Sequence, residues 1–222
     1  MRRRDIKAPE GNRVLVFASG SKDGGGSGFE AMVTSPYGLN VVAVVSNHEN
    51  GGVRQRADRL GVPFIFFDGP FTEEGYNSIL EKVGEVDLIF LSGWLKLAKG
   101  LDPTKTLNIH PGPLPRFGGR GMYGHHVHEA VMEAYRKFEI ATSEVNIHFV
   151  TDEYDRGPVV FKKQVSIYPF YTVDMLATEV NKVEHQFQSE VAAAFLMGKI
   201  SWSGKMEDEP TTFPNYLGVA PM

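Results

Sequence analysis

The sequence predicts an α/β protein with a doubly wound, mostly parallel sheet and an antiparallel hairpin in its C-terminal half. Two observations support this fold class. In the first half of the chain, short apolar runs alternate with segments of helical character, which is the pattern of parallel strands joined by crossover helices. In the second half, alternating segments at residues 144–150 and 159–165 flank one polar loop, which predicts two antiparallel strands.

The first half supplies predicted strands that are short, apolar and rich in β-branched residues, as buried parallel strands are. The helices between them carry boundary signals, with Thr72 as an expected N-cap and Gly61 as an expected C-terminal stop. In chain order we expect a strand at 13–18, a helix beginning near Phe29, a strand at 41–47, a helix at 53–60, a strand at 63–67, a helix at 72–83 and a strand at 87–91.

The second half opens with an extended segment, Leu107–His110, whose following prolines prevent a helix from continuing there. Helices are expected at 125–138 and 172–197. The inner face of the second helix is expected to consist of Leu176, Val180, Val183, Phe187 and Val191. We interpret residues 1–11 as a polar leader, 12–204 as one folded domain and 205–222 as a C-terminal tail with Phe213, Tyr216 and Leu217 as candidate surface contacts.

The composition narrows the classes of protein to consider. The formal net charge of the 222 residues is -4, which argues against a dedicated nucleic-acid binder. The chain contains no cysteine, which excludes a disulfide framework, a thiolate zinc site and a cysteine nucleophile. No apolar run approaches the ~18 residues of a membrane span. We therefore expect a cytoplasmic monomer or homodimer with small-molecule substrates and neither nucleic acid nor membrane as a partner.

A glycine-rich loop, Gly20–Gly28, separates the first predicted strand from the first predicted helix. The order of strand, loop and helix offers backbone N–H groups to an anion such as phosphate. The spacing is neither that of the dinucleotide fingerprint nor that of a Walker loop. A flexible surface loop is the alternative interpretation.

Asn108 and His110 lie two residues apart in an extended segment, so their side chains are expected to share one face. An amide donor beside an ionisable imidazole suits a carbonyl oxygen that gains negative charge during a reaction. A rigid proline-rich turn with a solvated histidine is the alternative. His125, His126 and His128 suggest a metal site, but no acidic residue completes an obvious ligand set, so we expect no metal.

Two segments together resemble the folate-dependent formyltransferases and, among their branches, the one that formylates glycinamide ribonucleotide in purine synthesis. They are Asn108–Pro115 and His148–Pro158, and the resemblance covers roughly residues 13–204. It implies the formyltransferase fold, 10-formyltetrahydrofolate as co-substrate and no metal.

By position, the resemblance implies that Asn108, His110 and Asp155 are the catalytic residues. It implies an acceptor site formed by Gly20, Ser21, Gly26, Ser27, Gly28, Pro111 and Glu184, although Glu184 taken alone is better explained as a solvated helix position. It implies a folate site formed by Trp94, Leu95, Lys96, Leu97, His148, Thr151, Asp152 and Glu153. The chain departs from the family in its longer glycine loop, in Gly28 where asparagine is common, in Lys96 where arginine is commoner and in its glycine-rich segment 117–124.

The chemistry implied is acyl transfer, in which an amine attacks the formyl carbon and the carbonyl oxygen becomes an oxyanion. We expect Asn108 and a protonated His110 to donate hydrogen bonds to that oxygen, and Asp155 to favour the charged imidazole and relay the proton of the amine.

Four other functions compete with this interpretation. A sugar-nucleotide N-formyltransferase or a formyltetrahydrofolate hydrolase would use the same three residues, although the hydrolase normally has an N-terminal regulatory domain. Methionyl-tRNA formyltransferase normally has a C-terminal RNA-binding domain, which we do not expect residues 205–222 to supply. A silent nucleotide-binding module would need only the glycine loop.

Overall fold

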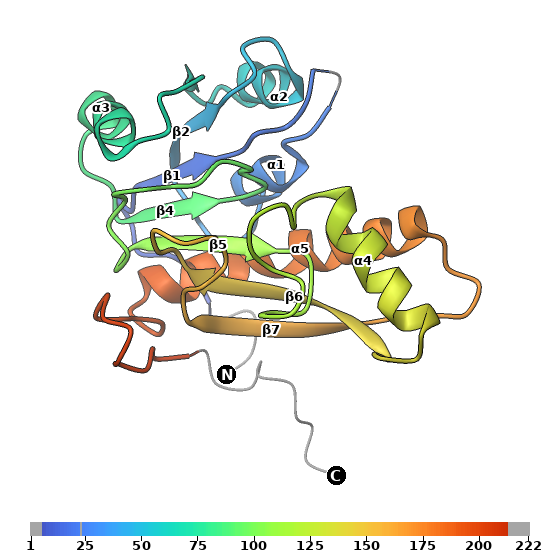
Figure 1. The fold of residues 1–222 in the computed structure, drawn as a ribbon. Helices are drawn as coiled ribbons and strands as arrows, with labels where there is room; N and C mark the ends of the chain where they lie inside the picture. The colour runs from blue at the N-terminus through green and yellow to red at the C-terminus, as the bar shows by residue number, and fades with distance from the viewer. Residues whose placement is uncertain (1–5, 23, 213–222) are drawn as a thin grey trace.

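The computed structural model describes residues 6–22 and 24–212, which fold around one seven-stranded sheet of order β3-β2-β1-β4-β5-β6-β7 (Figure 1). The pairings from β3 across to β5 are parallel, and β6 pairs antiparallel with both β5 and β7. The strands are β1 (Val14–Phe17), β2 (Val41–Ser46), β3 (Phe64–Phe66), β4 (Leu88–Leu91), β5 (Thr106–His110), β6 (Thr142–Phe149) and β7 (Val159–Ser166). The predicted fold class, with its antiparallel hairpin, is confirmed.

The helices follow the predicted order closely. They are α1 (Ser27–Val33), α2 (Gly52–Leu60), α3 (Glu73–Val83), α4 (His125–Arg136) and α5 (Val173–Leu196). The Thr72 hydroxyl caps α3 by accepting from the backbone N–H of Gly75 at 3.4 Å, and Gly61 ends α2 with φ 67°. Helix α1 begins at Ser27 rather than near Phe29, because the chain turns into helical geometry directly after Gly26, whose φ is 80°.

The core lies on both faces of the sheet because each central strand is apolar on both sides. In β4, Leu88 and Phe90 pack with residues of α1, α4 and α5, whereas Ile89 and Leu91 pack with residues of α3 on the other face. Burial on both faces is what continuous apolar strands of a parallel sheet require.

The described ends of the chain pack against this core. Residues 6–11 belong to the segment interpreted as a polar leader, yet Ile6 and Ala8 are buried and the Ala8 N–H donates to the Tyr37 carbonyl at 2.7 Å. At the other end, the Trp202 indole N–H donates to the carbonyls of Lys205 and Asp208. The candidate contacts Phe213, Tyr216 and Leu217 lie outside the described residues. Among the described helices, none is both long and apolar enough to cross a membrane.

The parallel strands β1, β4 and β5 point their carboxyl ends toward one edge of the sheet. The glycine loop follows β1, a loop from Ser92 follows β4, and His110 ends β5. Ligands of open α/β sheets bind at this edge. The topology therefore brings the three predicted site segments together.

Candidate active site

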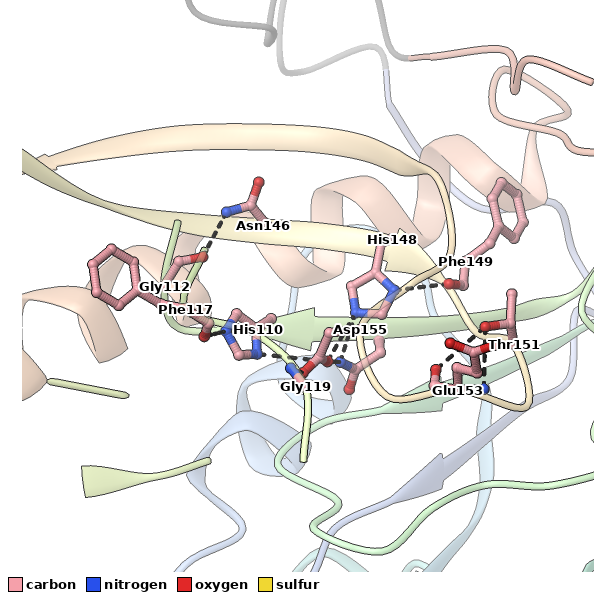
Figure 2. Close-up of polar contacts among 11 residues, drawn as sticks. His110, Gly112, Phe117, Gly119, Asn146, His148, Phe149, Thr151, Glu153 and Asp155 are labelled. Atoms are coloured by element: carbon pink, nitrogen blue, oxygen red, sulfur yellow. Dashed lines mark hydrogen bonds and ion pairs between the residues drawn. The ribbon is translucent and has the colours of Figure 1, made fainter. Parts of the chain in front are cut away.

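Strand β5 carries Asn108 and His110 on one face, as their spacing predicts. The antiparallel neighbour β6 places His148 opposite Asn108 and Asn146 opposite His110. His110 and His148 are almost fully buried, with 3% and 2% of their surfaces exposed. Asn146 is also buried, and its amide N–H donates to the Gly112 carbonyl at 2.7 Å, which holds the turn that follows His110 (Figure 2).

Asp155, from the loop between β6 and β7, lies at the centre of this polar group (Figure 2). Its Oδ1 lies 3.6 Å from His110 Nδ1, 3.3 Å from His148 Nε2 and 3.4 Å from Asn108 Nδ2. Its Oδ2 accepts from the backbone N–H of Gly119 at 2.8 Å. The three predicted catalytic residues therefore meet at one point.

The glycine-rich segment 117–124 makes this approach to Asp155 possible. A Cβ on Gly118 would lie 2.4 Å from Leu114 Cδ2 and 3.0 Å from Asp155 Cβ. Separations this short leave no room for a side chain, so the backbone of the segment lies directly against the Asp155 loop.

The partners of the two histidines determine which ring nitrogens carry protons. His110 Nε2 lies 2.8 Å from the Phe117 carbonyl and therefore donates, which leaves Nδ1 toward Asp155 as the site that can gain a proton. His148 Nδ1 lies 2.7 Å from the Phe149 carbonyl and likewise donates. His148 Nε2 lies between two side chains, 3.0 Å from the Asn108 amide and 3.3 Å from Asp155 Oδ1.

Asp155 favours the charged form of His110, as expected, but burial acts against it and has the larger effect. Burial lowers the pKa of His110 below its usual value; the Asp155 carboxylate opposes this shift, and the nearby His148 adds to it. Burial also tends to raise the pKa of Asp155, but the two histidines and the Gly119 N–H outweigh it and hold that pKa below its usual value. Burial therefore favours the neutral imidazole of His110, whereas the neighbouring groups favour the ionised form of Asp155.

A cavity of about 510 Å³ opens beside this cluster and reaches the glycine loop. Every residue of the predicted acceptor site lines it, namely Gly20, Ser21, Gly26, Ser27, Gly28, Pro111 and Glu184. The loop is a compact turn in which Ser21 and Gly24 bond each other's backbone, and a Cβ on Gly25 would lie 2.3 Å from the Gly20 Cα. Such contacts are possible only between glycines, so the loop presents its backbone to the cavity.

Most of the predicted folate residues lie around a smaller adjoining cavity of about 40 Å³. It is lined by Trp94, Lys96, Leu97, His148, Thr151 and Glu153, while Leu95 lines the larger cavity. Trp94 is largely a core residue, and its indole donates to the Tyr76 hydroxyl at 2.9 Å. Asp152 lines neither cavity, because its carboxylate accepts from the Gly100 backbone N–H at 3.2 Å instead.

Glu184 is a half-buried residue on α5 rather than a solvated one. Burial raises the pKa of its carboxyl to about 7, although the Asn181 amide, which donates to it at 3.3 Å, acts in the opposite direction. The residues that line the large cavity and were absent from the predicted site include the polar side chains of Ser92, Tyr154, His185 and Gln188. The position of Ser92 directly after β4 is the one sequence signal that favoured it.

The histidines of α4 separate into two environments. His125 and His126 are exposed and pair with acidic neighbours, with His125 Nε2 lying 3.0 Å from Asp174 Oδ1. His128 is buried against the large cavity, and burial lowers its pKa to about 4. Within the described residues, no group of three or more histidine, aspartate or glutamate side chains is arranged to hold a metal ion.

Comparisons with known proteins all find formyltransferases. The model of the formyl transferase family matches residues 12–192. The chain is 34% identical over 210 residues to chloroplastic phosphoribosylglycinamide formyltransferase of Arabidopsis thaliana, covering 87% of this chain and 68% of the relative. It is 34% identical over 207 residues to the chloroplastic enzyme of Vigna unguiculata, covering 86% of this chain but only 62% of that relative. It is 28% identical over 200 residues to phosphoribosylglycinamide formyltransferase of Bacillus subtilis, covering 83% of this chain and 94% of the relative.

Solved structures agree with the sequence relatives. Phosphoribosylglycinamide formyltransferase of Brucella melitensis superposes with a TM-score of 0.69 at 29% identity, over 83% of this chain and 95% of the other. Glycinamide ribonucleotide transformylase 1 of Symbiobacterium toebii superposes with a TM-score of 0.73 at 24% identity, over 90% and 92% of the two chains, which is a likeness of fold.

Proposed function

Because the chain belongs to the formyl transferase family, we propose that it transfers a formyl group from 10-formyltetrahydrofolate to the amine of glycinamide ribonucleotide. The names of its plant and bacterial relatives support this choice of substrates. The observation that carries the proposal is the convergence of Asn108, His110 and Asp155 on the wall of a cavity that also contacts the glycine loop.

We assign the two ends of the site from their chemistry. The glycine loop offers backbone N–H groups and close approach, which suits the phosphate of the acceptor. Glu184 lies in the same cavity, where its carboxylate would accept hydrogen bonds from the hydroxyl groups of the acceptor. The small cavity beside Trp94 and His148 would receive part of the folate, so the formyl group would lie next to Asn108.

In the reaction, the nitrogen lone pair of the acceptor amine forms a bond to the formyl carbon, and the carbonyl oxygen becomes an oxyanion. The amine proton moves to Nδ1 of neutral His110, and the resulting imidazolium is stabilised by the Asp155 carboxylate 3.6 Å away. The proton then passes to N10 of the folate as the bond from N10 to the formyl carbon breaks. The products are the formamide and tetrahydrofolate.

Asn108 would stabilise the oxyanion through its amide N–H groups. In the empty site these groups face His148 Nε2 at 3.0 Å and Asp155 Oδ1 at 3.4 Å. The second contact is long for a hydrogen bond and is the weaker of the two. We therefore assign that N–H to the formyl oxygen when substrate is bound.

A product assay with 10-formyltetrahydrofolate and a set of acceptors tests the proposal. We expect formylation of glycinamide ribonucleotide, much slower formylation of an amino-sugar nucleotide, and negligible formate release without an amine. Faster transfer to the amino sugar would establish a sugar-nucleotide N-formyltransferase, and rapid formate release without an amine would establish a hydrolase.

A further inference from the structure

A buried glutamine on α5 connects two loops of the cavity. Gln188 has no exposed surface, yet its side chain borders the cavity. Its Nε2 donates to the Gly28 carbonyl in the first turn of α1 at 3.0 Å. Its Oε1 lies 2.9 Å from the hydroxyl of Ser92, the residue that follows β4. One amide therefore joins the glycine loop to the edge of the central sheet.

The chemistry of the partners determines the orientation of this amide. The Gly28 carbonyl can only accept, so the NH₂ group of Gln188 must face it. The amide oxygen then faces Ser92, whose hydroxyl donates. Replacing Gln188 with an apolar residue would leave the Ser92 hydroxyl without this partner in a buried place, which is the costly way to lose a hydrogen bond.

The contact also explains why residue 28 is a glycine. A Cβ on Gly28 would lie 2.2 Å from Ser92 Oγ, whereas its next neighbours, the two polar atoms of the Gln188 amide, would be 3.2 and 3.3 Å away. The severe conflict is therefore with Ser92 Oγ, and the Gln188 amide would need only a small shift. The backbone at Gly28 is helical, so an alanine there meets no conformational obstacle of its own.

Two other side chains of α5 hold the same short helix. His185 Nε2 lies 3.1 Å from Ser27 Oγ, and the Ser189 hydroxyl donates to the Ala31 carbonyl at 3.3 Å. Helix α1 has only seven residues, too few to be stable or to hold its direction alone. Its place is therefore set by its neighbours, which are α5 and also α2, whose Arg56 and Arg59 each pair with Glu30 of α1 at 2.8 Å. Among these contacts, the one made by Gln188 also reaches the sheet.

We propose that Gln188 is a positioning residue for acceptor binding: through Gly28 and Ser92 it holds the glycine loop at the distance from β4 at which its backbone receives the acceptor phosphate. This inference rests on the proposed function. Gln188 acts on the loop both before and during the reaction, so its loss affects binding of the acceptor in the ground state and the transition state alike. Such a loss raises KM and leaves kcat nearly unchanged.

The first test compares Gln188→Leu with Gln186→Leu, an exposed position on the same helix. We expect Gln188→Leu to raise the KM for glycinamide ribonucleotide about tenfold, with kcat and the Kd of a folate analogue changed by less than about threefold. Gln186→Leu should leave all three values within about twofold. Equal losses of acceptor and folate affinity, or an unchanged KM, would overturn the proposal.

A second test does not depend on the stability of the Gln188 variant. Gly28→Ala should raise the acceptor KM, because the new Cβ collides with Ser92 Oγ. Ser92→Ala removes that atom but also takes away the partner of Gln188 Oε1, so Gly28→Ala should raise the acceptor KM less in a Ser92→Ala background than in the wild type. An equal effect of Gly28→Ala in the two backgrounds would contradict the geometry.

Calorimetric binding of glycinamide ribonucleotide to the wild-type protein distinguishes failure of the proposed function from failure of the positioning role of Gln188. A wild-type protein that neither binds nor formylates this acceptor would overturn the proposed function, and the role of Gln188 in acceptor binding with it. A wild-type protein that does both, with Gln188→Leu unchanged, would overturn the positioning role alone.

Discussion

Asp155→Asn is the substitution that best probes the pairing of a neutral histidine with a carboxylate. An asparagine has the same shape and can still accept from the Gly119 N–H, which now reaches Oδ2 at 2.8 Å. Its NH₂ group would then replace Oδ1, facing His110 Nδ1. The variant therefore keeps the loop in place but offers a donor where the imidazolium needs a negative charge.

The size of the effect follows from the distance between the two groups. Unit charges about 4 Å apart attract by roughly 1 kcal/mol in water and roughly 4 kcal/mol at the effective dielectric of a partly buried pair. The Asp155 side chain is only 11% exposed, which favours the upper part of this range. Each 1.36 kcal/mol corresponds to a factor of about ten in rate, so we expect kcat to fall on the order of 100- to 1000-fold.

The same substitution should also shift the pH dependence of kcat, in a direction that follows from the pKa of His110. Burial holds the pKa of His110 below its usual value against the opposing influence of Asp155, so the wild-type rate should fall only as the pH drops below about 6.5 and Nδ1 becomes protonated. Removing the Asp155 charge lowers that pKa further. The acid limb of kcat should therefore move to lower pH in Asp155→Asn.

The assay is single-turnover formyl transfer at saturating substrate across a pH series, with Asp58→Asn as a control. Asp58 is an exposed carboxylate of α2 paired with Arg54, and its loss should change kcat by less than about twofold. A nearly normal rate for Asp155→Asn, or an acid limb that moves to higher pH, would refute the assignment of His110 as the proton acceptor.

Three further predictions concern other residues of the site. Asn108→Ala and His110→Ala should each lower single-turnover rates by about 100- to 1000-fold while both substrates, measured by titration, bind within about threefold of normal. Acceptor affinity should rise as the pH rises through about 7, where the Glu184 carboxyl ionises, and calorimetry should show that Glu184→Gln removes this step without changing folate affinity. The histidine of the unfolded chain gains a proton near pH 6.5, whereas the pKa of buried His128 is about 4. The free energy of unfolding of the wild type should therefore decrease between pH 7 and pH 5, and in His128→Leu this decrease should be about 2 kcal/mol smaller. Urea unfolding at the two pH values measures the difference. Equal pH dependence in the two proteins would contradict burial of a neutral His128.

The local pattern of the chain by itself determined the elements and their type. Apolar β-branched runs such as Val41–Ser46 and helix boundaries such as Thr72 and Gly61 are predicted correctly from sequence, because periodicity and capping depend on residues close in the chain. The shared face of Asn108 and His110 followed from the same kind of rule, since alternate residues of a strand point to one side.

Only the tertiary structure decided the electrostatics and the contacts between distant segments. Whether His110 is charged depends on burial beneath loops far away in the chain, and that burial outweighed the carboxylate whose effect the sequence suggested. Gln188 meets Gly28 and Ser92 across separations of 160 and 96 residues, and no local pattern encodes such a meeting. Desolvation and close packing arise from the whole fold, so they become visible only once the chain is folded.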